Sequence, residues 1–301
     1  MDLKAMIKET ARNHGMDLCG VASLDRFEGS LEGRHPTQVL PGCKSVIVVG
    51  TRLLDGVIQA NFRAFENDRQ DLKGVYGTYG YALLPNFALT YACYAVAQAI
   101  ERELGEVAMP LSTGPMTNGS QISIRHAAVA AGLGEFGWMS IVLTPEYGPR
   151  NRFGVILTTA ELEPDPLYDG PKLCNPEVCK VCTSCCPTGA ISAYGDESGV
   201  KTCTLGEKTY TYGTVSIPRC QIAGNGMRKE FGGKEDLVEK DASPAEIAKA
   251  AAGMPISTAG LQHTESWHCG KCLSYCPAGS WFKKFHDRGL SDGFRAGNKS
   301  E

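Results

Sequence analysis

The sequence predicts an α+β protein with two parts, and two observations carry that prediction. Through about residue 165, apolar segments with strand periodicity alternate with segments of helical periodicity. Beyond that point cysteine, glycine and proline dominate, and ten of the thirteen cysteines lie between Cys174 and Cys276. We therefore expect an α/β domain at 1–165 and a ferredoxin-like domain at 166–301, in which bound metal replaces part of the apolar core.

The expected elements follow from apolar spacing and from glycine and proline punctuation. Helices are expected at 1–14, 57–70, 86–104 and 121–131. Strands are expected at 18–22, 45–50, 141–144 and 153–159, and a Gly/Tyr loop at 74–81. Residues 221–260 hold no cysteine, and we interpret them as an insertion between metal ligands. Ser243, Pro244 and Glu246 form a capping-box signature that begins a helix within it.

Composition sets limits on the partners of the chain. The net charge is −3 with no long basic run, so nucleic acid is not an expected partner. No apolar stretch approaches the length of a membrane span, and the N-terminus carries neither a twin arginine nor a signal-type apolar core. We therefore expect a cytoplasmic protein with no membrane partner, in which thirteen cysteines stay reduced. The sequence does not indicate an oligomeric state.

Two cysteine stretches share the pattern C-x2-C-x3-C-P. The first contains Cys179, Cys182 and Cys186, and the second contains Cys269, Cys272 and Cys276. Each matches the end of the bacterial ferredoxin run, in which the cysteine before proline binds the other cluster. The pattern predicts two [4Fe–4S] clusters with crossed ligation, and hence single-electron transfer.

Each cluster needs one more upstream thiolate. For the first stretch we favour Cys174, and the alternative is Cys185 with adjacent Cys186 crossing to the other cluster. Successive Cα atoms are only about 3.8 Å apart, which makes it awkward for neighbours to serve two clusters. For the second stretch the spacing leaves Cys203 and Cys220 open.

Other uses of the cysteines explain the pattern less well. Structural zinc would employ the two C-x2-C pairs and leave the cysteines before proline without a role. A disulfide scaffold needs an oxidising compartment and usually a small domain. A c-type haem needs C-x-x-C-H, which the sequence lacks.

The segment from Gly132 to Gly137 matches the dinucleotide motif G-x-G-x-x-G by letter. That motif must follow a strand and open a helix, whereas the segment before Gly132 has the pattern of a helix. We therefore reject a Rossmann site. Glycines here are expected to end a helix and to allow close backbone approach to a ligand or a neighbouring strand.

The stretch AGLGEFGWMSIVLTPEYGPRNRFGVILTTAELEPDPL (131–167), followed by the two cysteine stretches, resembles the epoxyqueuosine reductase and reductive dehalogenase superfamily. HGMDLCGVAS (14–23), PGCKSVIVVG (41–50) and STGPM (112–116) are similar to further blocks of that family. The resemblance implies a nitroreductase-like α/β domain that holds a corrinoid (cobalamin) and a two-cluster domain that supplies its electrons. It also favours Cys203 as the second upstream ligand.

The chain departs from the family pattern at several points. Ser112 stands where epoxyqueuosine reductases carry an acidic residue, so the usual proton donor is missing. Trp138 stands where dehalogenases typically carry arginine. The helical repeat region that follows the clusters of epoxyqueuosine reductases and the twin-arginine signal of respiratory dehalogenases are not found in this sequence.

The resemblance implies a cavity between the α/β domain and the clusters, since an electron acceptor must lie near a cluster. The expected cofactor-binding residues lie in four segments: Ser112, Gly114, Ser123, Gly132, Gly134, Pro145, Tyr147 and Gly148. Tyr79 or His126 would supply the proton. Histidine titrates near neutral pH unaided, whereas a tyrosine would need a neighbouring cation such as Arg125 to give up its proton there.

Two functions remain open at this point. In the first, the chain is a reductase that relays electrons from an external donor through its clusters to a corrinoid, which reduces a small organic substrate. In the second, it is a non-catalytic electron-transfer partner that reactivates the corrinoid of another protein.

Overall fold

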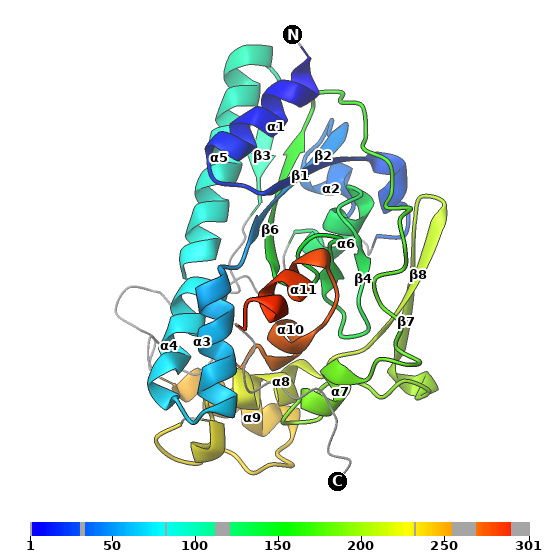
Figure 1. Ribbon diagram of the computed structural model, residues 1–301. Helices are drawn as coiled ribbons and strands as arrows, with labels where there is room; N and C mark the ends of the chain where they lie inside the picture. Colours follow the sequence, from blue (N-terminus) through cyan, green and yellow to red (C-terminus); the bar gives the residue numbers. More distant parts are fainter. Residues whose placement is uncertain are drawn as a thin grey trace.

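The computed structural model describes residues 2–30, 34–81, 83–111, 121–231, 233–254 and 269–289. Its order of elements is that of an α+β fold (Figure 1). The strands are β1 (Leu18–Ser23), β2 (Ser45–Arg52), β3 (Ala108–Pro110), β4 (Glu135–Phe136), β5 (Val142–Leu143), β6 (Asn151–Thr158), β7 (Val200–Leu205) and β8 (Lys208–Gly213). The α-helices are α1 (Leu3–Asn13), α2 (Pro36–Val39), α3 (Asp55–Glu66), α4 (Lys73–Tyr76), α5 (Leu84–Leu104), α6 (Ile124–Ala130), α7 (Val181–Cys185), α8 (Ile217–Gly224), α9 (Pro244–Gly253), α10 (Lys271–Tyr275) and α11 (Ser280–Asp287).

The centre of the fold is a four-stranded sheet in the order β1-β2-β6-β3, with every neighbouring pair antiparallel. In the middle of this sheet, Gly20 pairs with Val48, and Val48 pairs in turn with Val155. The run of valine and isoleucine in β2 is buried on both faces, which suits β-branched side chains on a pleated surface. The sequence therefore predicted this strand without difficulty.

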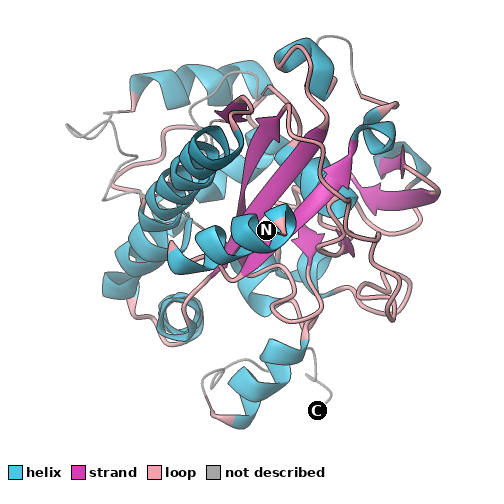
Figure 2. Cartoon of the chain, turned by 90° about the horizontal axis from the view of Figure 1, so that it is seen from above, coloured by secondary structure: helices cyan, strands magenta, loops and turns pink. Residues whose placement is uncertain are grey.

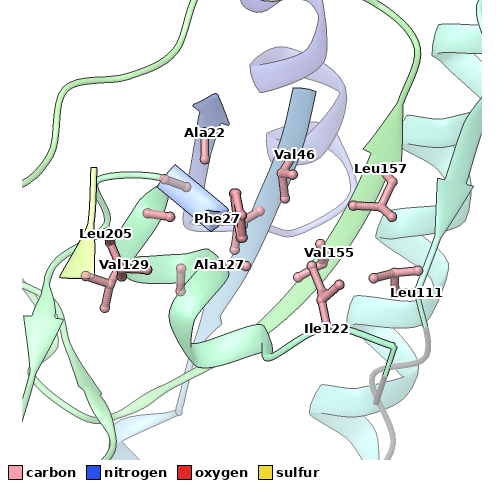
Figure 3. Packing of buried hydrophobic residues seen from close by; sticks show 14 of the residues in the cluster. Ala22, Phe27, Val46, Leu111, Ile122, Ala127, Val129, Val155, Leu157 and Leu205 are labelled. Carbon is pink, nitrogen blue, oxygen red and sulfur yellow. The ribbon is translucent and has the colours of Figure 1, made fainter. Parts of the chain in front are cut away.

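Alternate residues of the strands enter two different apolar cores. Val21, Ile47 and Val49 pack against α1 and α5, where Ile7, Leu89 and Cys93 are fully buried. Their neighbours along each strand, such as Ala22, Val46, Val155 and Leu157, pack on the opposite face with α6, Phe27 and Leu205 (Figure 3). The sheet is thus covered on both faces, as Figure 2 shows from above, and the period of two in each strand assigns every residue to its core.

One helical stretch corrects an expectation about membranes. Lys73–Leu104 is long and apolar enough to cross a membrane by length and composition, contrary to the sequence-based estimate. In the structure 44% of its most apolar window is buried, and Leu89, Ala92 and Val96 of α5 pack on the sheet. That packing is typical of a core helix.

The second cysteine stretch packs on α3 of the first part of the chain. Phe62 of α3 stacks on Tyr275 and Phe285, with ring centroids 4.7 and 5.8 Å apart. Asp55 accepts a hydrogen bond from the indole Nε1 of Trp281 at 2.7 Å. The cysteine-rich part therefore shares a core with the α/β part, while the domain boundary at residue 165 stays a prediction.

Most of the expected elements are present, and the errors have local causes. The capping box at Ser243 is confirmed, and α6 precedes the Gly132 motif as the rejection of a Rossmann site required. The expected loop at 74–81 is wrong, because α4 and a π-helical turn (Gly77–Tyr81) occupy it. The hairpin of β7 and β8 was missed, because its exposed face carries threonine and lysine rather than a clear apolar alternation.

Candidate metal centre

Both cysteine stretches fold into the same local structure. Cys182 lies in the short helix α7, and Cys272 lies in α10. The third cysteine of each stretch follows the helix in an extended conformation, with φ −70° and ψ 113° at Cys186 and φ −62° and ψ 126° at Cys276. A residue before proline avoids the helical region, so the proline ends each helix and directs its last cysteine away from the other two.

The first thiol group consists of Cys174, Cys179, Cys182 and Cys276. Burial raises the pKa of Cys182 to about 12, and the thiols of the other three members raise that pKa as well. Burial likewise raises the pKa of Cys276 to about 11, with contributions from Cys174 and Cys179. Such mutual effects require short distances. Three cysteines from the first stretch and its upstream segment therefore meet the last cysteine of the second stretch.

The second thiol group consists of Cys186, Cys220, Cys269 and Cys272. Burial raises the pKa of Cys272 well above its usual value, and Cys269, Cys185, Cys220 and Cys186 raise it further. The pKa of Cys269 is raised to about 12, first by burial and then by Cys220 and Cys186. The last cysteine of each stretch thus lies near the thiols of the other stretch, as crossed ligation would require.

The two alternative upstream cysteines, Cys203 and Cys220, lie in different parts of the structure. Cys203 lies on β7, where it pairs with Tyr210 and packs beside Phe136 in the core under the sheet. Cys220 lies on α8, and its thiol contributes to the raised pKa of both Cys269 and Cys272, although the residue as a whole keeps exposed surface. Cys220 thus lies near the second cysteine stretch, whereas the choice between Cys220 and Cys203 as a cluster ligand stays a prediction.

Cys185 lies near thiols of both groups. It lies beside Cys182 and also beside Cys269 and Cys186, and burial raises its pKa to about 12. It accordingly stands between the two thiol groups, whereas Cys174 lies within the first. This arrangement favours Cys174 as the fourth member of that group.

Hydrogen bonds position one cysteine of each thiol group. The Glu135 carboxylate accepts hydrogen bonds from the N–H groups of Leu173 and Cys174 at 2.6 and 3.0 Å. The N–H of Trp138 donates to the sulfur of Cys174 at 3.3 Å. In the other group the N–H of Ala190 donates to the sulfur of Cys186 at 3.2 Å. These N–H···S bonds favour thiolate and are a known means of tuning cluster potentials.

The donor set fits two cubane clusters. Among the residues that the structure describes, no three histidine, cysteine or acidic side chains converge on the position of one metal ion. A [4Fe–4S] cluster binds each of its four thiolates to a different iron, so it does not require such convergence. Each group offers four thiols, one of them in each group with a backbone N–H donor at its sulfur, and thiolates are the ligands that such a cluster requires.

Three glycines that were expected at a cofactor allow close contact between backbone segments of the protein. A Cβ atom on Gly132 would collide with the carbonyl of Pro166, and one on Gly134 with the carbonyl of Leu143. Both have positive φ, and so does Gly148, whose Cβ direction is filled by the Ala278 carbonyl. Their contact with a cofactor stays a prediction, but their packing on protein is a sufficient reason for glycine.

The turn before β6 is the joint between the sheet and the second cysteine stretch. The carbonyls of Pro145 and Glu146 accept hydrogen bonds from the N–H groups of Ser280 and Trp281, at 2.9 and 2.7 Å. These N–H groups belong to the first turn of α11 and would otherwise lack partners. Pro145, Tyr147 and Gly148, expected at a cofactor, therefore lie at this joint. Ser112 and Gly114 fall outside the described residues.

His126 is held on both ring nitrogens. Ser123 Oγ lies 2.6 Å from its Nδ1, and the Tyr212 hydroxyl lies 3.2 Å from its Nε2. Burial, with smaller effects of Arg125 and Lys201, lowers its pKa to about 4. The expectation that His126 titrates near neutral pH is therefore corrected, because burial disfavours the imidazolium.

The other two residues expected at the active site, Arg125 and Tyr79, have different surroundings. The Arg125 guanidinium donates hydrogen bonds to the carbonyl and hydroxyl oxygens of Ser140. Tyr79, in the π-helical turn, is 50% exposed. Tyr76 of the same region is buried instead, and its ring occupies the space that a side chain at Gly270 would need. Its role is to pack the start of the second cysteine stretch.

We predict that the His126 ring stays neutral from pH 8 to pH 5.5. Its folded-state pKa lies below the unfolded value of about 6.5, so the neutral ring's contribution to stability is present at pH 7 and is lost as the pH falls toward 4. Ring ¹⁵N chemical shifts of the intact protein measure the protonation state directly, and His126→Gln identifies the signal. A midpoint above pH 6 would contradict the burial argument.

No family model matches the chain. Over 114 residues it is 37% identical to the tetrachloroethene reductive dehalogenase of Desulfitobacterium hafniense, which is 36% of this chain and 19% of that protein. Over 78 residues it is 38% identical to the corresponding enzyme of Sulfurospirillum multivorans, which is 26% of this chain and 15% of that protein. The chain thus spans a fifth or less of the length of these curated relatives.

Solved structures extend the likeness to most of the chain. The catabolic reductive dehalogenase NpRdhA has a TM-score of 0.51 and 17% identity, covering 96% of this chain and 36% of that one. The same values hold for a reductive dehalogenase whose structure suggests a mechanism for B12-dependent dehalogenation. At this level of identity the likeness shows a shared fold. Over part of its length the chain is also similar in sequence to reductive dehalogenases.

Proposed function

We propose that the chain is an iron–sulfur oxidoreductase that relays single electrons through two [4Fe–4S] clusters to a corrinoid, for the reduction of a small organic substrate. The observation that carries the proposal is the exchange of Cys186 and Cys276 between the two thiol groups. Crossed ligation ties two clusters together at close range, which suits a relay better than two isolated structural sites.

The ligand sets follow from the thiol groups. Cys174, Cys179, Cys182 and Cys276 would hold the first cluster, and Cys186, Cys220, Cys269 and Cys272 the second. Burial keeps most of these thiols protonated in the empty protein, so cluster insertion releases protons and couples metal binding to folding. The N–H groups of Trp138 and Ala190 would then donate to bound thiolates.

The proposal that the chain acts on a corrinoid has a different basis from the proposal of the clusters. A B12-dependent relative shares the fold, and a corrinoid would supply a metal centre that reacts with the substrate. Within the described residues, however, Gly132, Gly134 and Gly148 contact protein backbone where a cofactor was expected. These residues do not fit a corrinoid site by themselves, so no catalytic step is derived through it.

The proton donor is likewise open. A reduction that adds two electrons to an organic substrate also takes up a proton, and His126 is neutral near pH 7 with both nitrogens hydrogen-bonded. Among the predicted donors, Tyr79 is the one with substantial exposed surface. It is therefore the first residue to test by substitution with phenylalanine.

A second function is favoured by the poor fit of Gly132, Gly134 and Gly148 to a corrinoid site. A protein that delivers electrons to the corrinoid of another protein needs the clusters but neither a corrinoid site nor a proton donor of its own. Ser112 in place of an acidic residue agrees with this alternative. Both functions share the cluster relay and differ in where the corrinoid is bound.

The ligand assignment gives a matched pair of variants. We expect Cys220→Ser to lose the iron of one cluster, about four of eight per chain by the ferredoxin pattern, because its thiol lies with Cys269 and Cys272. Cys203→Ser should keep all the iron, because Cys203 packs beside Phe136. Iron and sulfide analysis of anaerobically purified protein measures this. The reverse pattern would restore the assignment favoured by family resemblance.

The corrinoid assignment has its own test. If the chain is the reductase, adding cobalamin to the anaerobic holoprotein should give one bound corrinoid per chain after gel filtration, and dithionite should reduce it through the clusters. The Cys220→Ser protein should bind cobalamin but reduce it more slowly. Absence of binding, with intact clusters, would reject the reductase and leave the electron-transfer partner.

A further inference from the structure

Arg150 is a buried cation to which the proposed function gives no role so far. Arg150 directly precedes β6 and is 1% exposed, the largest fully buried side chain of the described residues. Its guanidinium forms no ion pair with a carboxylate in the part of the chain that the structure describes, and its Nε lacks a hydrogen-bond partner there. A buried charge without a counter-charge is strongly disfavoured.

The polar surroundings of Arg150 come from the second cysteine stretch. Its Nη1 donates to the carbonyls of Cys276 and Leu273 at 2.7 and 3.3 Å, and its Nη2 donates to the carbonyl of Ala278. The guanidinium also lies over the Trp281 ring, 4.5 Å from the ring centroid. These contacts orient the group, but neutral carbonyls and rings do not neutralise its charge.

The acidic group next to Arg150 is the Cys276 thiol. The Arg150 guanidinium is held at this residue by the 2.7 Å hydrogen bond from its Nη1 to the Cys276 carbonyl. In the proposed function Cys276 becomes a thiolate ligand of the first cluster. A cubane held by four thiolates carries net negative charge, and reduction adds one more. The anion that Arg150 lacks is therefore supplied when the cluster is bound.

We propose that Arg150 is the counter-cation of the cluster that Cys276 binds, and that it raises the reduction potential of that cluster relative to the other. This inference rests on the proposed function. A fixed cation stabilises the state with more negative charge, and the effect is large where water is excluded. Arg150 is thus a positioning and tuning residue; it does not contact substrate.

The second thiol group has a different cation. Lys271 interacts with Cys185 and Cys269, but its side chain is 21% exposed and lies 3.8 Å from the Glu66 carboxylate. Solvent and Glu66 screen its charge. The structure thus gives the first group an unscreened cation and the second a screened one, which makes the effect of Arg150 specific to one cluster.

EPR-monitored redox titration of the anaerobic holoprotein tests the proposal, with iron content measured on every sample. Arg150→Gln removes the charge, Arg150→Lys keeps it, and Lys271→Gln is the control at the other group. We expect Arg150→Gln to lower one of the two midpoint potentials by at least a tenfold change in the reduction equilibrium, about 59 mV for one electron. Arg150→Lys should keep both clusters and stay within that margin, and Lys271→Gln should leave the same couple unchanged.

The outcomes distinguish failure of the proposed function from failure of the proposed role of Arg150. Wild-type protein without two EPR-active clusters would overturn the proposed function itself. Two intact clusters in Arg150→Gln with unchanged potentials would overturn only the role of Arg150. If Arg150→Gln does not fold, Arg150→Lys decides: retention of both clusters at wild-type potentials supports a role for the charge, whereas loss of iron means that Arg150 serves only as a donor to three carbonyls.

Discussion

The exchange of Cys186 and Cys276 between the two thiol groups is the constraint on which the cysteine-rich part depends. In each cysteine stretch the first two cysteines lie before and within a short helix, and the last cysteine, which precedes a proline, follows that helix and lies near the thiols of the other stretch. Each group combines cysteines that lie more than 80 positions apart in the sequence. The segment between the two stretches carries Cys220 and a small core of its own, formed by Ile222, Phe231 and Ile247 among others.

The α/β part positions this arrangement through a few polar contacts at its edge. Glu135 holds the segment of Cys174, the turn at Pro145 and Glu146 binds the first turn of α11, and Arg150 binds the carbonyls around Cys276. All three lie in the stretch of 131–167 that resembles the family most clearly. That stretch thus serves as the joint between sheet and thiols, which gives a physical reason for its glycines and its buried charge.

The sequence predicted what local chemistry decides. The period of two in β2, the capping box at Ser243 and the paired cysteine spacings each determine their structure within a few residues. It left open, or predicted wrongly, what distant packing decides. Nothing near Cys203 or Cys220 indicates that one faces a core of aromatic rings while the other reaches Cys269. Likewise His126 has an ordinary local sequence, and its lowered pKa arises from burial against Phe136 and Tyr212.

Each cysteine stretch is proposed to supply ligands to both clusters, and one measurement tests this directly. Cys276→Ser and Cys186→Ser are each purified anaerobically, and EPR spectra are recorded during reductive titration. Crossed ligation predicts that Cys276→Ser alters the cluster of Cys174, Cys179 and Cys182, so that its spectrum matches that of Cys179→Ser, while Cys186→Ser matches Cys269→Ser. If Cys276→Ser matched Cys269→Ser instead, each stretch would bind its own cluster and the account would be wrong.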